Sequence, residues 1–422
     1  MTAARLPIQR PWQAKLLALD SHGKIRHLAR SKVMDLFHPG DLVIANDAAT
    51  LPASLSGEHL RTGRFIEVRL AARRSLAADS IRHCNAVVFG MGDFRIRTED
   101  RPKPPELMTG DRLALGVLRA TVEAILGHPR LVRLAFDGSL AGIWEGIARD
   151  GRPIQYSHIT RPLALWDVWT PIAGPPVAFE SPSAGFVLDW NVLASLKRQT
   201  VQFATITHAA GISSTGDGEL DALLPFDEPY YIPLTTALAV RHAQMRGRRV
   251  IAVGTTVVRA LEHAAQSDSF VRSGFGLATQ RIGTDTPLRV VDAILSGTHE
   301  PGTSHYHLLR AFVDDATLRG LDRELNLHNY RTHEFGDSIF VERNGRGGES
   351  LEQISCSVDF KGATRRAHGI AAHHSRCELT VVRTDFRFRA VMGKDAIEQD
   401  DISGDLCQFA ARRVVGTFGR GD

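Results

Sequence analysis

The stretch from Arg248 to Glu262 reads Arg-Arg-Val-Ile-Ala-Val-Gly-Thr-Thr-Val-Val-Arg-Ala-Leu-Glu, and its pattern decides the fold. The apolar run from Val250 to Val253 predicts a strand that is buried on both faces of a mainly parallel sheet. Gly254 ends this strand, and the apolar residues from Thr256 onward follow helical spacing. The stretch therefore predicts a strand, a tight turn and a helix in direct succession.

The turn of this unit is a candidate site for an anion. Backbone N–H groups at the start of a helix have no partner within the helix, so a carboxylate or phosphate can accept hydrogen bonds from them. Gly254, Thr255 and Thr256 lie at this point, and the threonine hydroxyls add further donors. A plain turn with a threonine cap explains the same residues. The local pattern leaves both interpretations open.

Length and composition are those of a globular protein with two or three domains. The chain has 422 residues, of which 43% are hydrophobic and 23% charged. No apolar run reaches the roughly 18 residues of a membrane span, and the first residues lack a signal-peptide block. Four cysteines do not make a disulfide framework in a chain of this length. We therefore expect a cytoplasmic protein without a membrane partner.

The net charge of +4 is modest, but arginine greatly outnumbers lysine. Arginine suits bidentate contacts with phosphate groups, which would fit a nucleic-acid partner. Coding bias in a GC-rich genome produces the same excess. The composition alone does not choose between these explanations.

A second buried strand is predicted near the N-terminus. Residues 15–20 and 24–28 have the pattern of two short strands around a turn, and the apolar run Leu42–Ala45 follows. This run ends at Asn46 and Asp47, at the carboxyl edge of a strand, where open α/β sheets bind ligands. An Asx turn is the alternative explanation for these two residues.

Residues 57–150 have a different sequence pattern. Apolar and polar residues alternate in short segments, which glycine and proline separate. No amphipathic helix fits most of this region, so it predicts an inserted all-β domain that resembles a barrel. The expected strands are Phe65–Leu70, Phe94–Thr98, Leu113–Thr121 and Leu131–Phe136.

Helices alternate with apolar strands again over residues 151–343, which continues the domain begun by residues 1–56. The strand Val201–Thr207 brings His208 to its carboxyl end, just before a glycine-containing loop. A histidine in that position is a candidate for acid–base chemistry, although a structural histidine is the simpler explanation. The predicted fold is a large mixed α/β domain with the all-β insert and a small C-terminal extension.

The extension, residues 344–422, starts with a glycine-rich linker and continues with alternating residues typical of half-exposed strands. Between Lys361 and Lys394, lysine and arginine outnumber acids by eight to two, which suits a solvated strand face or a surface for RNA. Zinc would need better-spaced ligands than the group offers, so we expect no metal there. That group comprises Cys356, His368, His373, His374 and Cys377.

A series of short motifs between Pro39 and Asp337 resembles one family, the S-adenosylmethionine:tRNA ribosyltransferase-isomerases of queuosine biosynthesis. The motifs follow one another in the order that this family has. They are Pro39-Gly40-Asp41-Leu42 with Asn46-Asp47, Pro182-Ser183-Ala184-Gly185, Gly254-Thr255-Thr256 with Arg259 and Leu261-Glu262, Arg289-Val290-Val291-Asp292-Ala293, His299 with Pro301, Ala311-Phe312, and Phe335-Gly336-Asp337.

The resemblance implies a fold and an activity. The family has a large mixed α/β domain with an inserted all-β domain. Its members move the ribosyl part of S-adenosylmethionine onto 7-aminomethyl-7-deazaguanine at the wobble position of tRNA, and they release adenine and methionine. The resemblance therefore implies S-adenosylmethionine as a substrate and tRNA as a partner. It implies no metal, because the sulfonium already acidifies the neighbouring carbon.

The same resemblance implies roles for particular residues. The reaction needs a base for the carbon next to the sulfonium, an acid for the departing adenine, and a polar clamp for the methionine end. The expected catalytic residues are His208, Glu228, Asp292 and His299. The expected substrate-binding residues are Asn46, Asp47, Ser183, Gly185, Gly254, Thr255, Thr256, Arg259 and Asp337.

Departures from the family pattern keep other functions open. The family's Asn-Asp-Thr-Arg ends in Ala49 here, and Val187 replaces a histidine of its Ala-Gly-Leu-His-Phe motif. Each missing polar contact in a closed site removes about 2–4 kcal/mol of transition-state stabilisation. The alternatives are a paralogue that uses S-adenosylmethionine on another acceptor, and a non-catalytic RNA-binding protein on the same scaffold. The sequence does not define the oligomeric state.

Overall fold

The protein is described by a computed structural model that covers residues 1–9, 11, 13–266, 270–343, 380–384 and 387–391. The chain divides into two units, Met1–Glu349 and Ser350–Asp422. In the second unit the described residues form one antiparallel pair, β20 (Thr380–Thr384) with β21 (Arg387–Val391). The cysteines and histidines of the extension, from Cys356 to Cys377, and most of its basic run lie outside the described residues.

The centre of the first unit is a nine-stranded sheet with the order β16-β14-β13-β4-β15-β17-β19-β2-β3. Four neighbouring strands in its middle run parallel, and they include the predicted strand after Arg249. These are β13 (Gln202–His208), β4 (Leu42–Asn46), β15 (Val250–Val253) and β17 (Ala293–Gly297).

The outer strands complete the sheet with mixed directions. β14 and β16 extend it antiparallel beyond β13, while β19 is antiparallel to β17 and parallel to β2. The hairpin predicted near the N-terminus is confirmed by the antiparallel pairing of β2 with β3. These strands are β14 (Glu228–Ile232), β16 (Gly274–Ala278), β19 (Ser338–Glu342), β2 (Lys15–Leu19) and β3 (Ile25–Ala29).

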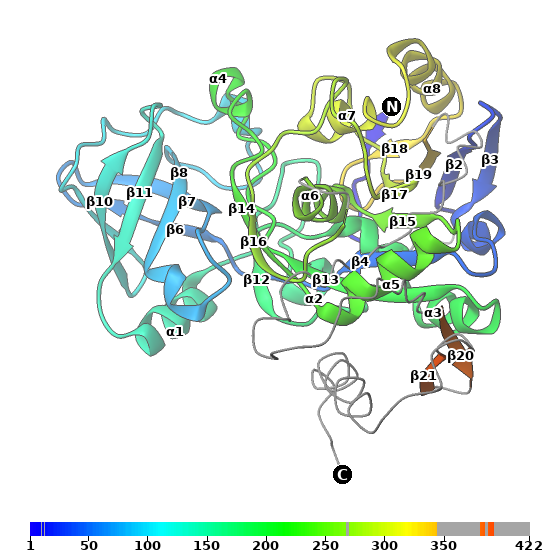
Figure 1. Ribbon diagram of the computed structural model, residues 1–422. Helices are drawn as coiled ribbons and strands as arrows, with labels where there is room; N and C mark the ends of the chain where they lie inside the picture. The colour runs from blue at the N-terminus through cyan, green and yellow to red at the C-terminus, as the bar shows by residue number, and fades with distance from the viewer. Residues whose placement is uncertain (10, 12, 267–269, 344–379, 385–386, 392–422) are drawn as a thin grey trace, which may run out of the picture. The chain divides into compact units, whose positions relative to one another are not determined.

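Helices cover both faces of this sheet, which explains why its central strands are apolar without alternation. Leu42 and Ile44 of β4 pack into one core, whereas Val43 and Ala45 pack into the core on the other face. Figure 1 shows α5 and α6 lying over the first face. That face carries α5 (Leu234–Met245), α6 (Thr255–Ala264), α7 (Ser304–Leu309) and α8 (Asp315–Leu327); the other carries η1 (Arg30–Leu36), η4 (Ser183–Val187) and α3 (Trp190–Arg198).

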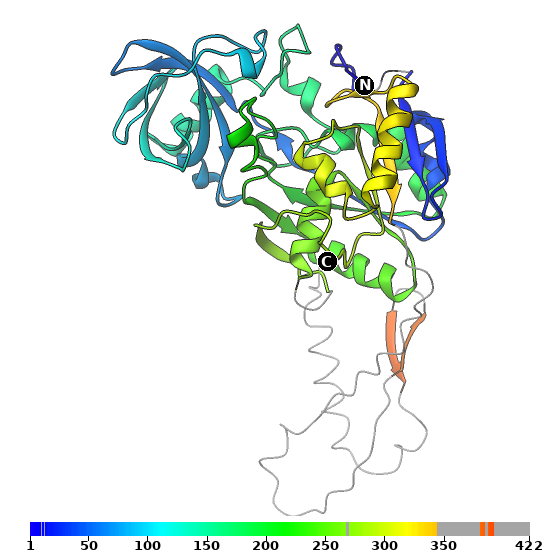
Figure 2. The same cartoon turned by 90° about the horizontal axis from the view of Figure 1, so that it is seen from above.

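The predicted all-β insert contains a closed antiparallel barrel with the order β10-β11-β8-β7-β6-β9. Its alternating apolar residues, such as Leu55, Val68 and Val88, fill the barrel core, and α1 (Leu140–Asp150) packs against that core. Figures 1 and 2 show the barrel beside the end of the sheet that carries β14 and β16. The mixed α/β fold class with its barrel is thus confirmed. The barrel strands are β6 (Ser54–His59), β7 (Arg64–Ala72), β8 (His83–Phe89), β9 (Arg112–Leu115), β10 (Leu118–Ile125) and β11 (Leu131–Phe136).

One predicted barrel strand is wrong, and two real strands were missed. Phe94–Thr98 forms turns that lead into η3, because the alternating Arg95, Ile96 and Arg97 are all exposed and no face of the segment is buried. The missed strands are β6 and β8, and the expected strand Leu113–Thr121 is divided between β9 and β10. The remaining elements are β1 (Thr2–Ala3), β5 (Ala49–Thr50), η2 (Ala78–Arg82), η3 (Thr98–Asp100), α2 (Leu165–Val168), β12 (Pro176–Ala178), α4 (Gly218–Asp221) and β18 (Arg331–Thr332). Within the described ranges, no helix has the length and apolar character to cross a membrane.

Glu262 holds α6 to the segment that enters β17. Its carboxylate accepts hydrogen bonds from the backbone N–H groups of Arg289 (2.7 Å), Val290 (3.0 Å) and Val291 (2.9 Å). Only 5% of Glu262 is exposed, so water cannot replace these bonds. Burial raises the pKa of Glu262, while the three backbone donors act in the opposite direction. The buried carboxylate thereby fixes the position of the predicted strand-turn-helix unit against its neighbour.

We expect Glu262→Ala to destabilise the protein strongly. The change leaves three buried donors without an acceptor, and each unpaired buried group costs about 1–3 kcal/mol. Urea unfolding of the full chain should show the loss. Glu145→Ala, on an exposed position of α1, is the matched control and should change stability by less than about 0.5 kcal/mol. Equal stability of the two variants would contradict the structural role of Glu262.

Candidate functional site

Polar residues from several strands meet at one edge of the central sheet. The carboxyl ends of the parallel strands lie at this edge, together with the amino ends of the antiparallel strands β14 and β19. This arrangement follows from strand direction alone, and it suits ligand binding in an open α/β sheet. It brings together these predicted residues: Asn46, Asp47, His208, Glu228, Gly254, Thr255, Thr256, His299 and Asp337.

Asn46 connects the ends of β4 and β13 with the start of α6. Its Nδ2 donates to the carbonyl of His208 (2.9 Å) and to the hydroxyl of Thr256 (3.3 Å). Its Oδ1 accepts from the backbone N–H groups of His208 (2.9 Å) and Ala48 (3.0 Å). The carboxylate of Asp47 accepts from the hydroxyl of Thr207 at 2.6 Å. The side chains of Asn46 and Asp47 therefore position other parts of the edge.

His208 is a neutral, buried imidazole. Its ring stacks on Tyr230, with 6.5 Å between the ring centroids and 4° between the planes. Neither ring nitrogen has a hydrogen-bond partner among the residues that the structure describes. Burial and the charge of Arg259 hold the pKa of His208 well below its usual range. Nε2 lies 3.6 Å from a carboxylate oxygen of Glu228, so an imidazolium formed here would have a counter-ion.

Glu228 and Arg259 form a buried ion pair next to His208. The guanidinium also donates to the carbonyls of Ala278 (2.9 Å) and Phe226 (3.1 Å). The other oxygen of Glu228 accepts from the backbone N–H of Gly211 at 2.6 Å. Burial raises the pKa of Glu228, and Arg259 opposes this shift. The guanidinium of Arg259 is thus engaged within the protein, which differs from the expected clamp on a substrate carboxylate.

The loop after His208 is held between Glu228 and the barrel. The N–H of Ile212 donates to the carbonyl of Ala71 in β7 at 3.1 Å. Ile212 also packs with Ala71 and Phe89 on the outside of the barrel. A side chain at Gly211 would bring a Cβ within 2.2 Å of the Ala71 carbonyl, so only glycine fits there.

The start of α6 remains the part of the edge best suited to an anion. Gly254 has a φ of +95°, and this left-handed conformation turns the chain directly from β15 into the helix. The Thr255 hydroxyl contacts Nδ1 of His305 at 3.0 Å. η4, which includes Ser183 and Gly185, lies against this turn, because a Cβ at Gly254 would be 3.4 Å from Ala184.

Four histidines and one glutamate form a group beside the sheet edge. Of these only His299 was predicted, whereas His158, His305, His333 and Glu334 were not. The ring of His299 stacks on His305 (4.4 Å between centroids), and His158 stacks on His333 (4.3 Å). Burial lowers the pKa of His299 and His333, and lowers that of His305 to about 4. Nε2 of His158 faces a carboxylate oxygen of Glu334 at 3.2 Å. Although burial opposes it, His158 and His333 hold the pKa of Glu334 below its usual range.

Glu180 is a second carboxyl group that the sequence did not indicate. It accepts a hydrogen bond from the hydroxyl of Tyr156 at 2.6 Å. Burial raises the pKa of Glu180 to about 7, against opposing hydrogen bonds from Ser213 and Tyr156, and the nearby Glu334 adds to the rise. Two neighbouring carboxyl groups therefore differ, since Glu334 is ionised and Glu180 titrates near neutral pH. Such a pair is typical of acid–base sites.

Two predicted residues have structural partners. Asp292 lies just before β17, at the opposite edge of the sheet, and its carboxylate accepts from the N–H of Val250 at 2.9 Å. The structure therefore does not bring Asp292 together with the other candidates. Asp337 lies at the expected edge, but its two oxygens accept from the N–H groups of Lys15 and Arg331, both at 2.7 Å.

Within the described part of the chain, two groups have donor atoms close enough to hold a metal, with all atoms within 4.8 Å of one another. The first is His158, His333 and Glu334. Its two rings are nearly parallel, at 18°, so their in-plane lone pairs do not converge on one ion. We assign this group to ion pairing. The second group, His27, Glu324 and His328, lies on the surface away from the sheet edge.

Comparison with known proteins gives consistent matches. Residues 1–341 match the model of a family described as queuosine biosynthesis protein. The chain is 30% identical over 346 residues to the S-adenosylmethionine:tRNA ribosyltransferase-isomerase of Geotalea uraniireducens, covering 80% of this chain and 95% of that protein. The enzyme of the same name from Syntrophotalea carbinolica is 27% identical, with the same coverage. A crystal structure of an S-adenosylmethionine tRNA ribosyltransferase from Thermotoga maritima is 22% identical, covering 80% of this chain and 95% of that one, with a TM-score of 0.42.

The buried pair of Glu228 and Arg259 should show strong coupling in unfolding experiments. Arg259→Met alone leaves a buried carboxylate without its partner, which costs about 3–5 kcal/mol. Glu228→Gln in the same chain removes that charge, so the double variant should lose clearly less stability than the sum of the single variants. Urea unfolding of the four proteins measures the coupling. Strictly additive losses would mean that the two groups do not stabilise each other.

Proposed function

Because the chain belongs to the queuosine biosynthesis protein family, we propose that it transfers the ribosyl moiety of S-adenosylmethionine to a 7-deazaguanine base in tRNA. The relatives' names support this reaction, and the family match covers the barrel and all of the sheet except Glu342 at the end of β19. The single observation in the site that carries the proposal is His208, a neutral imidazole beside a buried carboxylate, whose ring nitrogens have no hydrogen-bond partner among the described residues.

In this proposal, His208 is the base that takes a proton from the carbon next to the sulfonium. A base must be unprotonated before the reaction, and the lowered pKa of His208 keeps it so. After the proton transfer, the imidazolium lies 3.6 Å from the Glu228 oxygen. Arg259 and the N–H of Gly211 hold that carboxylate in place. The buried ion pair thus stabilises the charge that develops on the base.

Glu180 is the acid that we assign to the departing adenine. With a pKa of about 7, a substantial fraction of this carboxyl group is protonated at neutral pH, unlike an ordinary glutamate. Once it has given up its proton, the carboxylate accepts the hydrogen bond from Tyr156. The neighbouring Glu334 keeps its negative charge and favours protonation of Glu180.

The start of α6 is the proposed clamp for the methionine carboxylate. Its first backbone N–H groups and the helix dipole favour a negative group. The Thr256 hydroxyl accepts from Asn46, which leaves its own hydrogen available to donate to a ligand. Asn46 thereby orients the clamp and His208 together, while Ala184 of η4, which lies between Ser183 and Gly185, is next to the turn.

The activity is tested with the purified full chain, S-adenosylmethionine, and tRNA that carries 7-aminomethyl-7-deazaguanine. We expect release of adenine together with a tRNA nucleoside whose mass has increased by the transferred group. His208→Asn should lower turnover by about 10²-fold or more, as expected for loss of a general base, with little change in the affinity for S-adenosylmethionine. His22→Asn, in an exposed turn, is the control. Binding of S-adenosylmethionine without any change in tRNA mass would contradict the proposed acceptor.

The pH profile tests the role of Glu180 separately. If this group must be protonated, the rate should fall tenfold per pH unit above about pH 7. Glu180→Gln should remove this fall, because glutamine does not titrate, and should lower the rate by about 10²–10⁴-fold. Glu145→Gln on exposed α1 should leave the profile unchanged. A fall above pH 7 that persists in Glu180→Gln would assign the titration to another group.

A further inference from the structure

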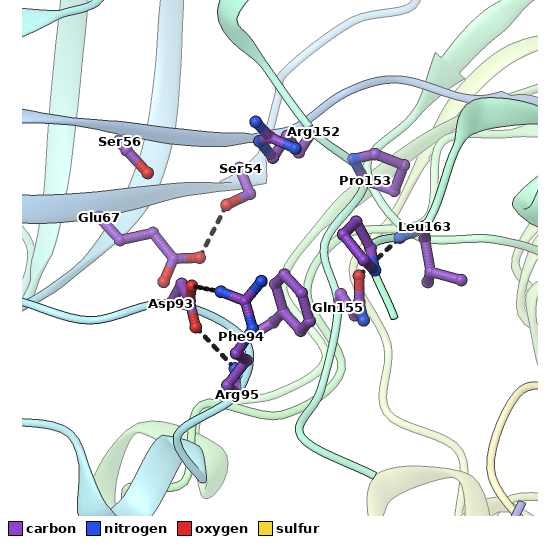
Figure 3. Close-up of a pocket in the computed structure, with 11 residues that line it drawn as sticks. Ser54, Ser56, Glu67, Asp93, Phe94, Arg95, Arg152, Pro153, Gln155 and Leu163 are labelled. Atoms are coloured by element: carbon purple, nitrogen blue, oxygen red, sulfur yellow. Dashed lines mark hydrogen bonds and ion pairs between the residues drawn. The ribbon is translucent and has the colours of Figure 1, made fainter. Parts of the chain in front are cut away.

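A hollow of about 260 Å³ lies where the barrel meets the segment after α1 (Figure 3). It shares no residue with the set at the sheet edge. The barrel contributes Ser54, Ser56 and Glu67, and the loop after β8 contributes Phe94 and Arg95. Arg152 and Pro153 line it from the segment after α1, together with Leu163.

A second hollow of about 300 Å³ adjoins the first. Both are lined by Arg152, Pro153 and Leu163, so Arg152 lies on the wall that they have in common. Each volume is near or below the lower end of the roughly 300–1,000 Å³ range of drug-sized ligand pockets. The pair therefore forms a two-part groove in which each part suits a group about the size of one base.

Three acidic side chains line the two hollows, and each is paired with an arginine, which leaves Arg152 as a further positive charge. Asp93 pairs with Arg95, and Asp150 pairs with Arg149. Glu67 is already neutralised, because it accepts from the guanidinium of Arg69 (2.7 Å) and the hydroxyl of Ser54 (2.7 Å) and pairs with Arg101. The side chain of Arg152 is exposed and makes no ion pair or hydrogen bond with any residue that the structure describes. A free guanidinium at the junction of two hollows suits a phosphate group.

Flat and apolar surfaces accompany this charge. The guanidinium of Arg95 lies over the ring of Phe94 at 4.8 Å from its centroid, as Figure 3 also shows. Pro153 and Leu163 contribute apolar surface. Aromatic and guanidinium planes stack with unpaired bases, and serine hydroxyls can bond base edges. Planar groups, hydroxyls and a guanidinium that is unpaired within the described residues together make a site suited to single-stranded nucleic acid.

We propose that this groove binds two consecutive unpaired nucleotides of the RNA substrate, with one base in each hollow and the linking phosphate on Arg152. The proposal rests on the proposed function, which supplies RNA as the partner. In this proposal the barrel has a separate role. The groove holds the RNA loop, while the reacting base occupies the sheet edge. Stacking and phosphate contacts depend little on which bases are present, so the groove can bind RNA without recognising a long nucleotide sequence.

The test uses the full chain and an unmodified anticodon stem-loop RNA, with binding measured by fluorescence anisotropy at several salt concentrations. Arg152→Gln should weaken binding about tenfold and lower the slope of log K against log salt by about 0.7, the value for one phosphate contact in a single strand. Phe94→Ala should weaken binding about tenfold through lost stacking, with an unchanged salt slope. Arg119→Gln and Phe65→Ala, on exposed barrel positions outside both hollows, are the matched controls.

Calorimetry with S-adenosylmethionine distinguishes failure of the groove proposal from failure of the proposed function. Arg152→Gln and Phe94→Ala should bind S-adenosylmethionine as the unchanged protein does, and saturating RNA should restore their turnover. Wild-type RNA affinity and salt slope in both variants would overturn the groove while leaving the proposed function intact. If the unchanged protein binds S-adenosylmethionine but not the stem-loop, both the groove and the tRNA acceptor are wrong.

Discussion

The four hydrogen bonds of the Asn46 side chain are the constraint on which the site depends. They link the end of β4, the end of β13 and the first turn of α6, three elements that are far apart in the sequence. A buried amide has little freedom once its donor and its acceptor are both used. The position of His208 relative to the Thr256 hydroxyl is therefore set by the scaffold before any ligand arrives. This arrangement reduces the entropy that binding must supply.

Sequence patterns predicted the parts of the fold in which burial repeats along the chain. The run Val250–Val253 and the barrel alternation both mark buried faces, and the structure contains both. The local pattern indicated candidate site residues at strand ends and at a helix start, as at His208 and Thr256, whereas Glu228 and His299 were expected from the family resemblance. Glu180 and His158 come from irregular segments without periodicity, so only folding brings them close to the sheet. Asp292 was expected in the site from the family resemblance, but it precedes β17 and therefore lies at the opposite edge of the sheet.

The departures from the family pattern have a simple structural counterpart. Val187 packs in the core between the sheet and α3, and only 5% of it is exposed. Ala49 is equally buried in β5, which pairs with β12. Both positions are therefore closely packed, and neither leaves an empty space where a polar side chain of the family would lie. Further polar groups near the sheet edge come from His158, His333 and Glu334, on the segments that flank it.

The Gly211 loop bears on how such a chain can change during evolution. An inserted barrel suggests a module that could be lost or exchanged, since its own core is complete. Here, however, the carbonyl of Ala71 in β7 accepts from the N–H of Ile212, and the N–H of the preceding Gly211 donates to Glu228. Removing or replacing the barrel would release the Ile212 amide, shift the adjoining Gly211, and so disturb Glu228, the partner of His208. Barrel and loop must therefore be inherited together, and a chimera between relatives would need its junctions outside both.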